Sequence, residues 1–128
     1  AFEAGVPFLC GSETGFSVTP YGDWHYKELE VFVDKLGLTP LEAITCGTKN
    51  ASQAMRRDDI GVIAEGKVAD LLVLSENPSK DVSVLGNKEL IEKVFLSGKE
   101  VDLNPAPKRI KDPSGWRISS YSNKILEK

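Results

Sequence analysis

Residues 9–15 (LCGSETG) join an apolar run to a carboxylate, Glu13, which stands between Ser12 and Thr14 and precedes Gly15. A carboxylate in a loop bounded by glycines can accept a proton from water, and it can also ligate a metal ion. The same residue can instead be an ordinary loop glutamate that caps a nearby amide. The residues alone leave both interpretations open.

Further candidate residues are Tyr21, in the loop of about a dozen residues that follows, and Trp24 and His25, at the start of the helix expected after it. Loops of this length are uncommon in compact domains and are often functional. We therefore consider these three side chains as candidates for a substrate-binding mouth. The alternative is that His25, placed in the first turn of the helix expected here, is merely exposed or packed.

The chain has two cysteines, Cys10 and Cys46. Two cysteines form no disulfide framework, so free thiols in a reducing compartment are expected. We accordingly favour a cytoplasmic protein over a secreted one. Cys10 lies in an apolar run, where a thiol is typical of packing and not of a nucleophile.

Residues 61–68 (GVIAEGKV) nearly match a phosphate-binding loop. That motif requires Ser or Thr after the lysine to hold Mg²⁺, and here the position is Val68. A strand is also expected after this segment, where the motif needs the N-terminus of a helix. The sequence therefore argues against an NTPase.

The first part of the chain predicts one strand and several helices. Residues 6–10 (VPFLC) form a short apolar run typical of a strand buried on both faces. A helix is expected after Asp23, ending at Gly37. Thr39, with Pro40 and Glu42, predicts a second helix that opens with a capping box and runs to about residue 46. A short third helix is expected over residues 51–55.

Strand signals dominate the second part of the chain. Residues 70–74 (DLLVL) predict a strand, and Asn77-Pro78 predicts a turn. Residues 91–96 and 99–102 flank Ser97-Gly98, a hairpin signal. We therefore divide the chain into a β-α-α portion at 1–57, a small β unit at 58–102, and an unassigned tail at 103–128.

Composition limits the functional classes. The 128 residues are 41% hydrophobic and 27% charged, with a net charge of −3, as in a globular protein. No run approaches the roughly 20 apolar residues of a membrane helix. Basic residues concentrate in the tail, without the aromatic interleaving of a nucleic-acid surface. We expect neither a membrane nor a nucleic-acid partner.

Residues 59–74 (DIGVIAEGKVADLLVL) resemble the carboxy-terminal signature of the amidohydrolase superfamily, in its imidazolonepropionase and prolidase-like branch. Further segments match this pattern in order along the first 102 residues: 4–7 (AGVP), 38–44 (LTPLEAI), 50–51 (NA) and 94–101 (VFLSGKEV). The resemblance implies an α/β fragment of a (β/α)₈ barrel enzyme. Residues 6–10 would be the last strand, the helices would close the barrel, and 58–102 would be the C-terminal part of a small β-sandwich. It also implies that the N-terminal part of the enzyme is missing.

The same resemblance assigns a role to Glu13, which stands where family members usually carry Asp after the last barrel strand. It implies a general base and a candidate metal ligand. The complete enzyme would use a divalent metal, expected to be zinc, to hydrolyse a C–N bond in a small amide, cyclic amide or dipeptide-like substrate. The family's His-x-His pair and other ligands are absent from these residues, so we expect no metal and no activity in this chain alone.

Two further expectations concern association. Strands separated from their barrel and sandwich neighbours would leave open edges, so we expect the chain to self-associate. A competing interpretation treats the chain as a small α+β interaction module without catalysis.

Overall fold

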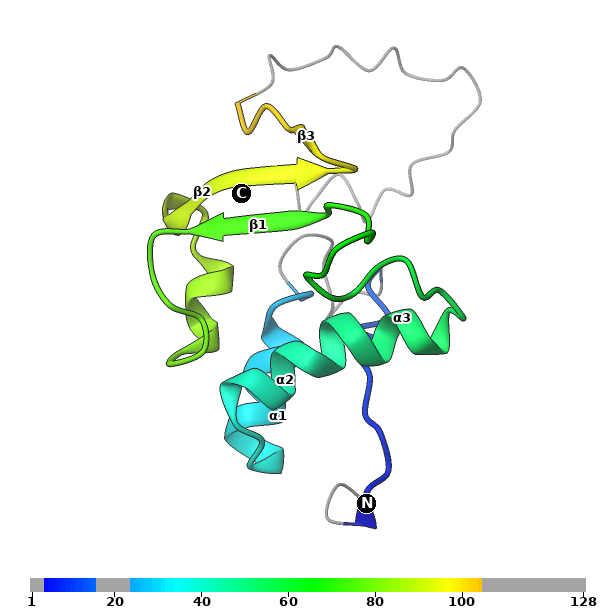
Figure 1. Ribbon diagram of the computed structural model, residues 1–128. Coiled ribbons are helices and arrows are strands. Elements are labelled where there is room, and N and C mark those ends of the chain that lie inside the picture. Colours follow the sequence, from blue (N-terminus) through cyan, green and yellow to red (C-terminus); the bar gives the residue numbers. More distant parts are fainter. Residues whose placement is uncertain (1–3, 16–23, 105–128) are drawn as a thin grey trace, which may run out of the picture.

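The computed structural model describes residues 4–15 and 24–104. Figure 1 shows the helical residues 27–54 on one side and the three strands on the other. The helical elements are α1 (Lys27–Leu36), α2 (Pro40–Thr45), the π-helix η2 (Cys46–Asn50), α3 (Ala51–Ala54), and the 3₁₀ helices η3 (Val82–Gly86) and η4 (Lys88–Leu90); the strands are β1 (Leu71–Leu74), β2 (Ile91–Leu96) and β3 (Lys99–Glu100). Within these ranges, no helix combines the length and the apolar character that crossing a membrane requires.

Helix α1 ends as predicted but begins later than predicted. Gly37 closes it with a φ of 74°, a left-handed conformation that suits glycine, and its amide donates to the carbonyls of Phe32 and Val33. Asp23 lies outside the described residues. The N-cap is Tyr26, without a side-chain cap bond, so His25 lies in the turn before the helix and not in its first turn.

The predicted capping box of α2 is confirmed. The Thr39 hydroxyl accepts from the Glu42 amide, and the Glu42 carboxylate accepts from the Thr39 amide at 2.8 Å. Pro40 occupies the first turn, where its missing N–H has no helical partner to lose. The helix continues through η2 into α3, so the third helix predicted at 51–55 is present as the end of one helical run (Figure 1).

The three strands form an antiparallel sheet in the order β1-β2-β3. Leu72 pairs with Val94, and Leu96 pairs with Lys99 across the predicted hairpin. Ser97 and Gly98 have φ values of 51° and 76°, as a type I′ turn requires. The Asp70 carboxylate accepts from the Ser97 amide at 2.7 Å and ties this turn to the start of β1.

Residues 6–10, predicted as a buried strand, form no strand in the described chain and are not buried. These residues have no strand pairing, and Val6 and Leu9 are 49% and 48% exposed. A strand exists only where a second strand supplies hydrogen bonds. No segment of the described chain lies beside residues 6–10 in that way, so the apolar run stays outside any sheet.

A small core joins the helices to the β unit. Its buried apolar residues come from the loop after α1, from α2, from η2 and from η3: Leu38, Ala43, Cys46, Val82 and Val84. Helix α1 contacts both α2 and η3. Gly86 lies directly against the Tyr26 ring, since a Cβ atom there would come within 2.3 Å of it. This contact places the β unit beside the start of α1.

The segment that resembles a phosphate-binding loop is an irregular loop. Residues 58–70 contain no helix, and the strand β1 follows them. Gly61 has a φ of 84°, and an added Cβ would lie 2.6 Å from the Ser52 hydroxyl oxygen. The glycine in this near-match therefore serves close packing against α3, consistent with the argument against an NTPase.

Candidate active site

Three contacts hold residues 8–11 against the helices. The side-chain amide of Asn50 donates to the carbonyl oxygen of Phe8 at 2.6 Å. The Phe8 ring packs against the Phe32 ring of α1, with centroids 6.2 Å apart. The backbone amide of Gly11 donates to both carboxylate oxygens of Glu28, at 3.0 and 2.9 Å. The segment that leads to Glu13 is thus attached to α1 and to η2.

Glu13 occupies an unusual backbone conformation. Its φ is 49°, and Gly15, two residues later, has a φ of 115°. A left-handed conformation costs a residue with a Cβ about 1–2 kcal/mol, so the surrounding structure has to hold it. The residue is exposed. The loop therefore presents the Glu13 side chain on a turn whose preceding residues are anchored.

The other predicted site residues lie partly within the described chain. His25 is beside the loop, because its Nδ1 atom lies 3.4 Å from the Ser12 hydroxyl oxygen, a long hydrogen bond whose direction depends on the ring tautomer. Trp24 is half-buried, and its carbonyl accepts from the Glu28 amide at 3.3 Å. Tyr21 lies outside the described residues. Their predicted contact with a substrate stays a prediction.

A cavity of about 360 Å³ opens where the loop meets α1 and η2. It is lined by Cys10, Gly11, Ser12, His25, Glu28, Leu29 and Gly47. Gly47 belongs to the π-helical turn, and a Cβ there would lie 3.4 Å from both the Cys10 sulfur and the Leu29 side chain. A glycine and a widened turn thus let the helix approach the loop closely, and π-turns recur at functional sites.

Both cysteines are free, and neither is suited to nucleophilic catalysis. Partial burial, then the negative charge of Glu28 and the nearby Cys46, raise the pKa of Cys10 from 9.0 to about 11. Burial also raises the pKa of Cys46, against a smaller opposing effect of its contact with Asn50. A thiol without accessible thiolate is inert, which agrees with the packing role predicted for Cys10.

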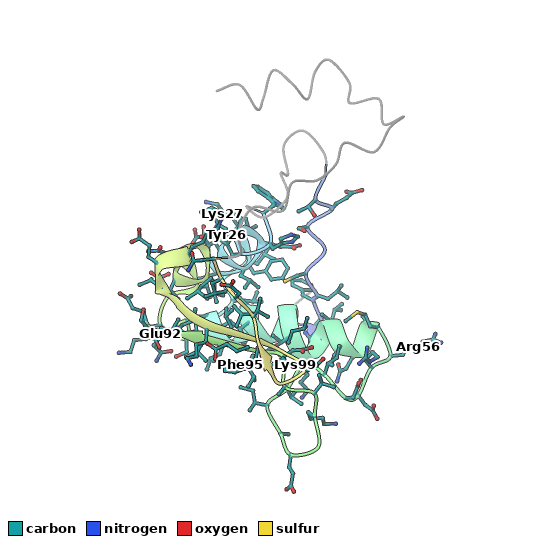
Figure 2. All side chains as sticks on the ribbon, turned by 90° about the horizontal axis from the view of Figure 1, so that it is seen from above. Tyr26, Lys27, Arg56, Glu92, Phe95 and Lys99 are labelled. Atoms are coloured by element: carbon teal, nitrogen blue, oxygen red, sulfur yellow. The ribbon has the colours of Figure 1, made fainter. Side chains whose placement is uncertain are left out.

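A larger hollow of about 530 Å³ lies along α3, lined by Lys49, Ser52, Gln53, Arg56, Arg57, Asp58, Ile60 and Val62. Figure 2 shows Tyr26 and Lys27 together at the start of α1 and Arg56 projecting well away from them. Arg57 in this hollow already forms an ion pair with Asp59. No residue of the loop that carries Glu13 lines this hollow, whereas Gly11 and Ser12 of that loop line the smaller cavity, so the smaller cavity is the better candidate site.

The described residues do not fit a complete metal centre. No group of three or more His, Cys, Asp or Glu side chains in residues 4–15 and 24–104 is placed to hold an ion. A catalytic zinc site requires three protein ligands and an open position. Glu13 can supply one of these ligands at most.

Sequence reasoning missed two residues that build the site, Glu28 and Asn50. In the sequence Asn50 stands out only as part of the family segment at 50–51, and Glu28 only contributes to an acidic first turn. An acidic residue in the first turn usually interacts with its own helix. One feature of the sequence could have pointed to Glu28: it lies in the first turn of the helix that follows a long, glycine-bounded loop.

Comparison with known proteins shows to which family this chain is related. The sequence pattern of the Amidohydrolase family matches residues 5–101. The chain belongs to this family. It is 36% identical over 101 residues to the ochratoxinase of Aspergillus niger, covering 77% of this chain and 20% of that protein. It is 49% identical over 68 residues to the imidazolonepropionase of Pyrobaculum arsenaticum, covering 53% of this chain and 17% of that protein.

Solved structures give the same relationship for this amidohydrolase chain. A prolidase complexed with N-methylphosphonate-L-proline superposes with a TM-score of 0.66 at 30% identity, over 78% of this chain and 24% of that one. The chain spans about a fifth of the length of the ochratoxinase and imidazolonepropionase relatives. The resemblance to the imidazolonepropionase and prolidase-like branch is confirmed.

Proposed function

We propose that this chain is the carboxy-terminal portion of a metal-dependent amidohydrolase that hydrolyses a C–N bond in an amide, cyclic amide or dipeptide-like substrate. The family match over residues 5–101 supports this, as do relatives described as ochratoxinase, imidazolonepropionase and prolidase. The chain's share of those relatives is consistent with a portion of a larger enzyme.

The observation that carries the proposal is the presentation of Glu13. An exposed carboxylate stands on a left-handed turn, directly after an apolar run that is attached to two helices. In (β/α)₈ barrels the catalytic groups stand just past the carboxyl ends of the strands. Residues 6–10 would be the last strand of such a barrel, and residues 58–102 would be the C-terminal part of the adjoining sandwich. The exposure of Val6 and Leu9 suits a strand whose neighbours belong to other parts of the enzyme.

Glu13 acts in this proposal as the general base that accepts the proton of the attacking water and returns it to the leaving nitrogen. A divalent metal, expected to be zinc, would polarise the substrate carbonyl and lower the pKa of the water. Glu13 is a candidate ligand, and the remaining ligands would come from outside this chain. Trp24, His25 and Tyr21 would contact the substrate at the mouth of the site.

Substitution of Glu13 in the complete enzyme tests the proposal. Glu13→Gln keeps the size but cannot accept the proton, so we expect kcat to fall by about 10²- to 10⁴-fold. Glu13→Asp retains a carboxylate and should lose less. Metal content separates the two roles. If Glu13 is only a general base, Glu13→Gln keeps its metal, and if Glu13 is an essential ligand, Glu13→Gln loses it.

A matched control is Glu65→Gln, which makes the same change in the exposed loop before β1 and should leave kcat unaltered. An unchanged kcat in Glu13→Gln would return Glu13 to the role of a loop carboxylate. The 128-residue chain alone, supplied with Zn²⁺ or Mn²⁺, should not turn over dipeptides or cyclic amides. Metal-dependent turnover by the chain alone that survives further purification would contradict the fragment proposal.

A further inference from the structure

The carboxylate of Glu28 links helix α1 to the loop that carries Glu13. Both of its oxygens accept from the Gly11 amide, at 3.0 and 2.9 Å, across 17 residues of sequence. The contact is charge-assisted, which makes it stronger than a hydrogen bond between neutral groups. It also places a negative charge in the first turn of α1, where the helix dipole favours one.

This contact is not a helix cap. The N-cap of α1 is Tyr26, which has no side-chain cap bond, although Glu28 is close enough in sequence to interact with that turn. The neighbouring Glu30 behaves differently, because its carboxylate binds Lys27 within the helix at 2.6 Å. Glu28 is thus directed at a separate segment of the chain.

The geometry of the loop shows what such a contact can do. Gly11 lies two residues before Glu13, whose φ of 49° is held only if its neighbours are restrained. The polar restraints described on the preceding side include the Asn50 contact with Phe8, the Glu28 contact with Gly11, and the Ser12–His25 contact. Of these three, the Glu28 contact is the charged one, and it acts on the backbone nearest to Glu13.

We propose that Glu28 is a positioning residue, which rests on the proposed function: by holding the Gly11 amide it fixes the turn that aims the Glu13 carboxylate at the reacting water. Glu28 does not touch the substrate in this role. Small displacements of a catalytic group are costly, since a shift of about 1 Å can lower a rate by about 10²-fold. Burial and, to a smaller extent, the negative charge of Glu28 raise the pKa of Cys10, the residue before Gly11.

The first test uses the 128-residue chain and measures hydrogen exchange of the Gly11 amide by NMR. Glu28→Ala should speed this exchange by about tenfold or more, because the amide loses its charged acceptor. Glu28→Gln, which retains one acceptor oxygen and the size, should give a smaller increase. Glu30→Gln removes a carboxylate from the same turn and should leave the Gly11 exchange rate unchanged. The pKa of Cys10 should fall in Glu28→Gln and stay near 11 in Glu30→Gln.

The second test measures kinetics in the complete enzyme. Glu28→Ala should lower kcat by about 10- to 100-fold with little change in KM, and Glu28→Gln should restore part of the rate. If the Gly11 amide exchanges at the same rate in Glu28→Ala as in the wild type, the Glu28–Gly11 contact does not protect this amide and the proposal fails. If the amide exchanges faster but kcat is unchanged, the contact exists but Glu28 does not position Glu13. Failure of the proposed function appears elsewhere, as an unaltered rate in Glu13→Gln, so the two failures are distinguishable.

Discussion

The side-chain amide of Asn50 lies 2.6 Å from the carbonyl oxygen of Phe8 and joins residues 42 positions apart. In a sheet, a neighbouring strand would donate a hydrogen bond to the Phe8 carbonyl. Here the Asn50 side chain, which belongs to a helix, donates it. It therefore explains how residues 6–10 stay attached to the helices although they pair with no strand of the described chain.

Asn50→Asp should loosen this attachment. The substitution keeps the size of the side chain but replaces the amide donor with a carboxylate oxygen that faces the Phe8 carbonyl oxygen. The carbonyl oxygen then has no donor, and a buried acceptor that loses its partner costs about 1–3 kcal/mol of stability. We expect the amides of residues 8–11 to exchange at least about tenfold faster by NMR. Gln53→Glu, the equivalent change at an exposed position of the same helical run, should have no such effect. Equal exchange rates in the two variants would show that the Asn50 contact does not hold the segment.

Gly61→Ala should destabilise the chain more than Gly66→Ala. Both glycines have positive φ values, 84° and 78°, so each alanine pays a backbone cost of about 1–2 kcal/mol. At Gly61 the new Cβ also meets the buried Ser52 hydroxyl at 2.6 Å and the Thr48 carbonyl at 2.9 Å, whereas nothing lies within 4 Å at Gly66. Overpacking should add about 1–3 kcal/mol to the loss in free energy of unfolding, measured in urea by circular dichroism. If both variants lose the same free energy of unfolding, the close approach of Gly61 to Ser52 does not add to the cost, and the prediction is wrong.

The raised pKa of Cys10 predicts a loss of stability in alkali. The folded chain holds this thiol proton up to about pH 11, whereas the unfolded chain releases it near pH 9.0. Between these values the unfolded state binds fewer protons, so the contribution is fully present below pH 9 and is lost as the pH rises to about 11. Cys10→Ser removes the titration, and its urea midpoint should therefore decline less than that of the wild type across this window. A constant difference between the two proteins from pH 8 to 11.5 would contradict the assignment.

We expect the chain to self-associate through its sheet. The register places Leu72, Val94, Leu96 and Val101 on one face, and Leu72 and Leu96 are 46% and 61% exposed. Leu72→Lys should raise the apparent Kd of association about tenfold or more, because burying a leucine contributes about 1.5–3 kcal/mol. Ala64→Lys adds the same charge in the exposed loop before β1 and should change little. Light scattering coupled to size exclusion measures both, and a compact wild-type monomer at high concentration would favour the interaction-module alternative.

Local interactions explain what the sequence determined by itself. The Thr39–Glu42 capping box, the left-handed Gly37 and the Ser97-Gly98 turn each act within a few residues, and all three are present as predicted. Periodicity and turn residues encode such elements directly, because the interacting groups are neighbours along the chain. The family pattern is likewise a property of residues in order, and the match over residues 5–101 confirms it. The role that this pattern implies for Glu13 stays a prediction.

Only the tertiary structure decided how these elements meet. The Glu28–Gly11, Asn50–Phe8 and Gly86–Tyr26 contacts join residues far apart in sequence, and no periodic pattern specifies which carboxylate will find which amide. The apolar run at residues 6–10 looked like a strand because its composition is that of one. A strand also needs a partner, and pairing depends on which other segments lie beside it.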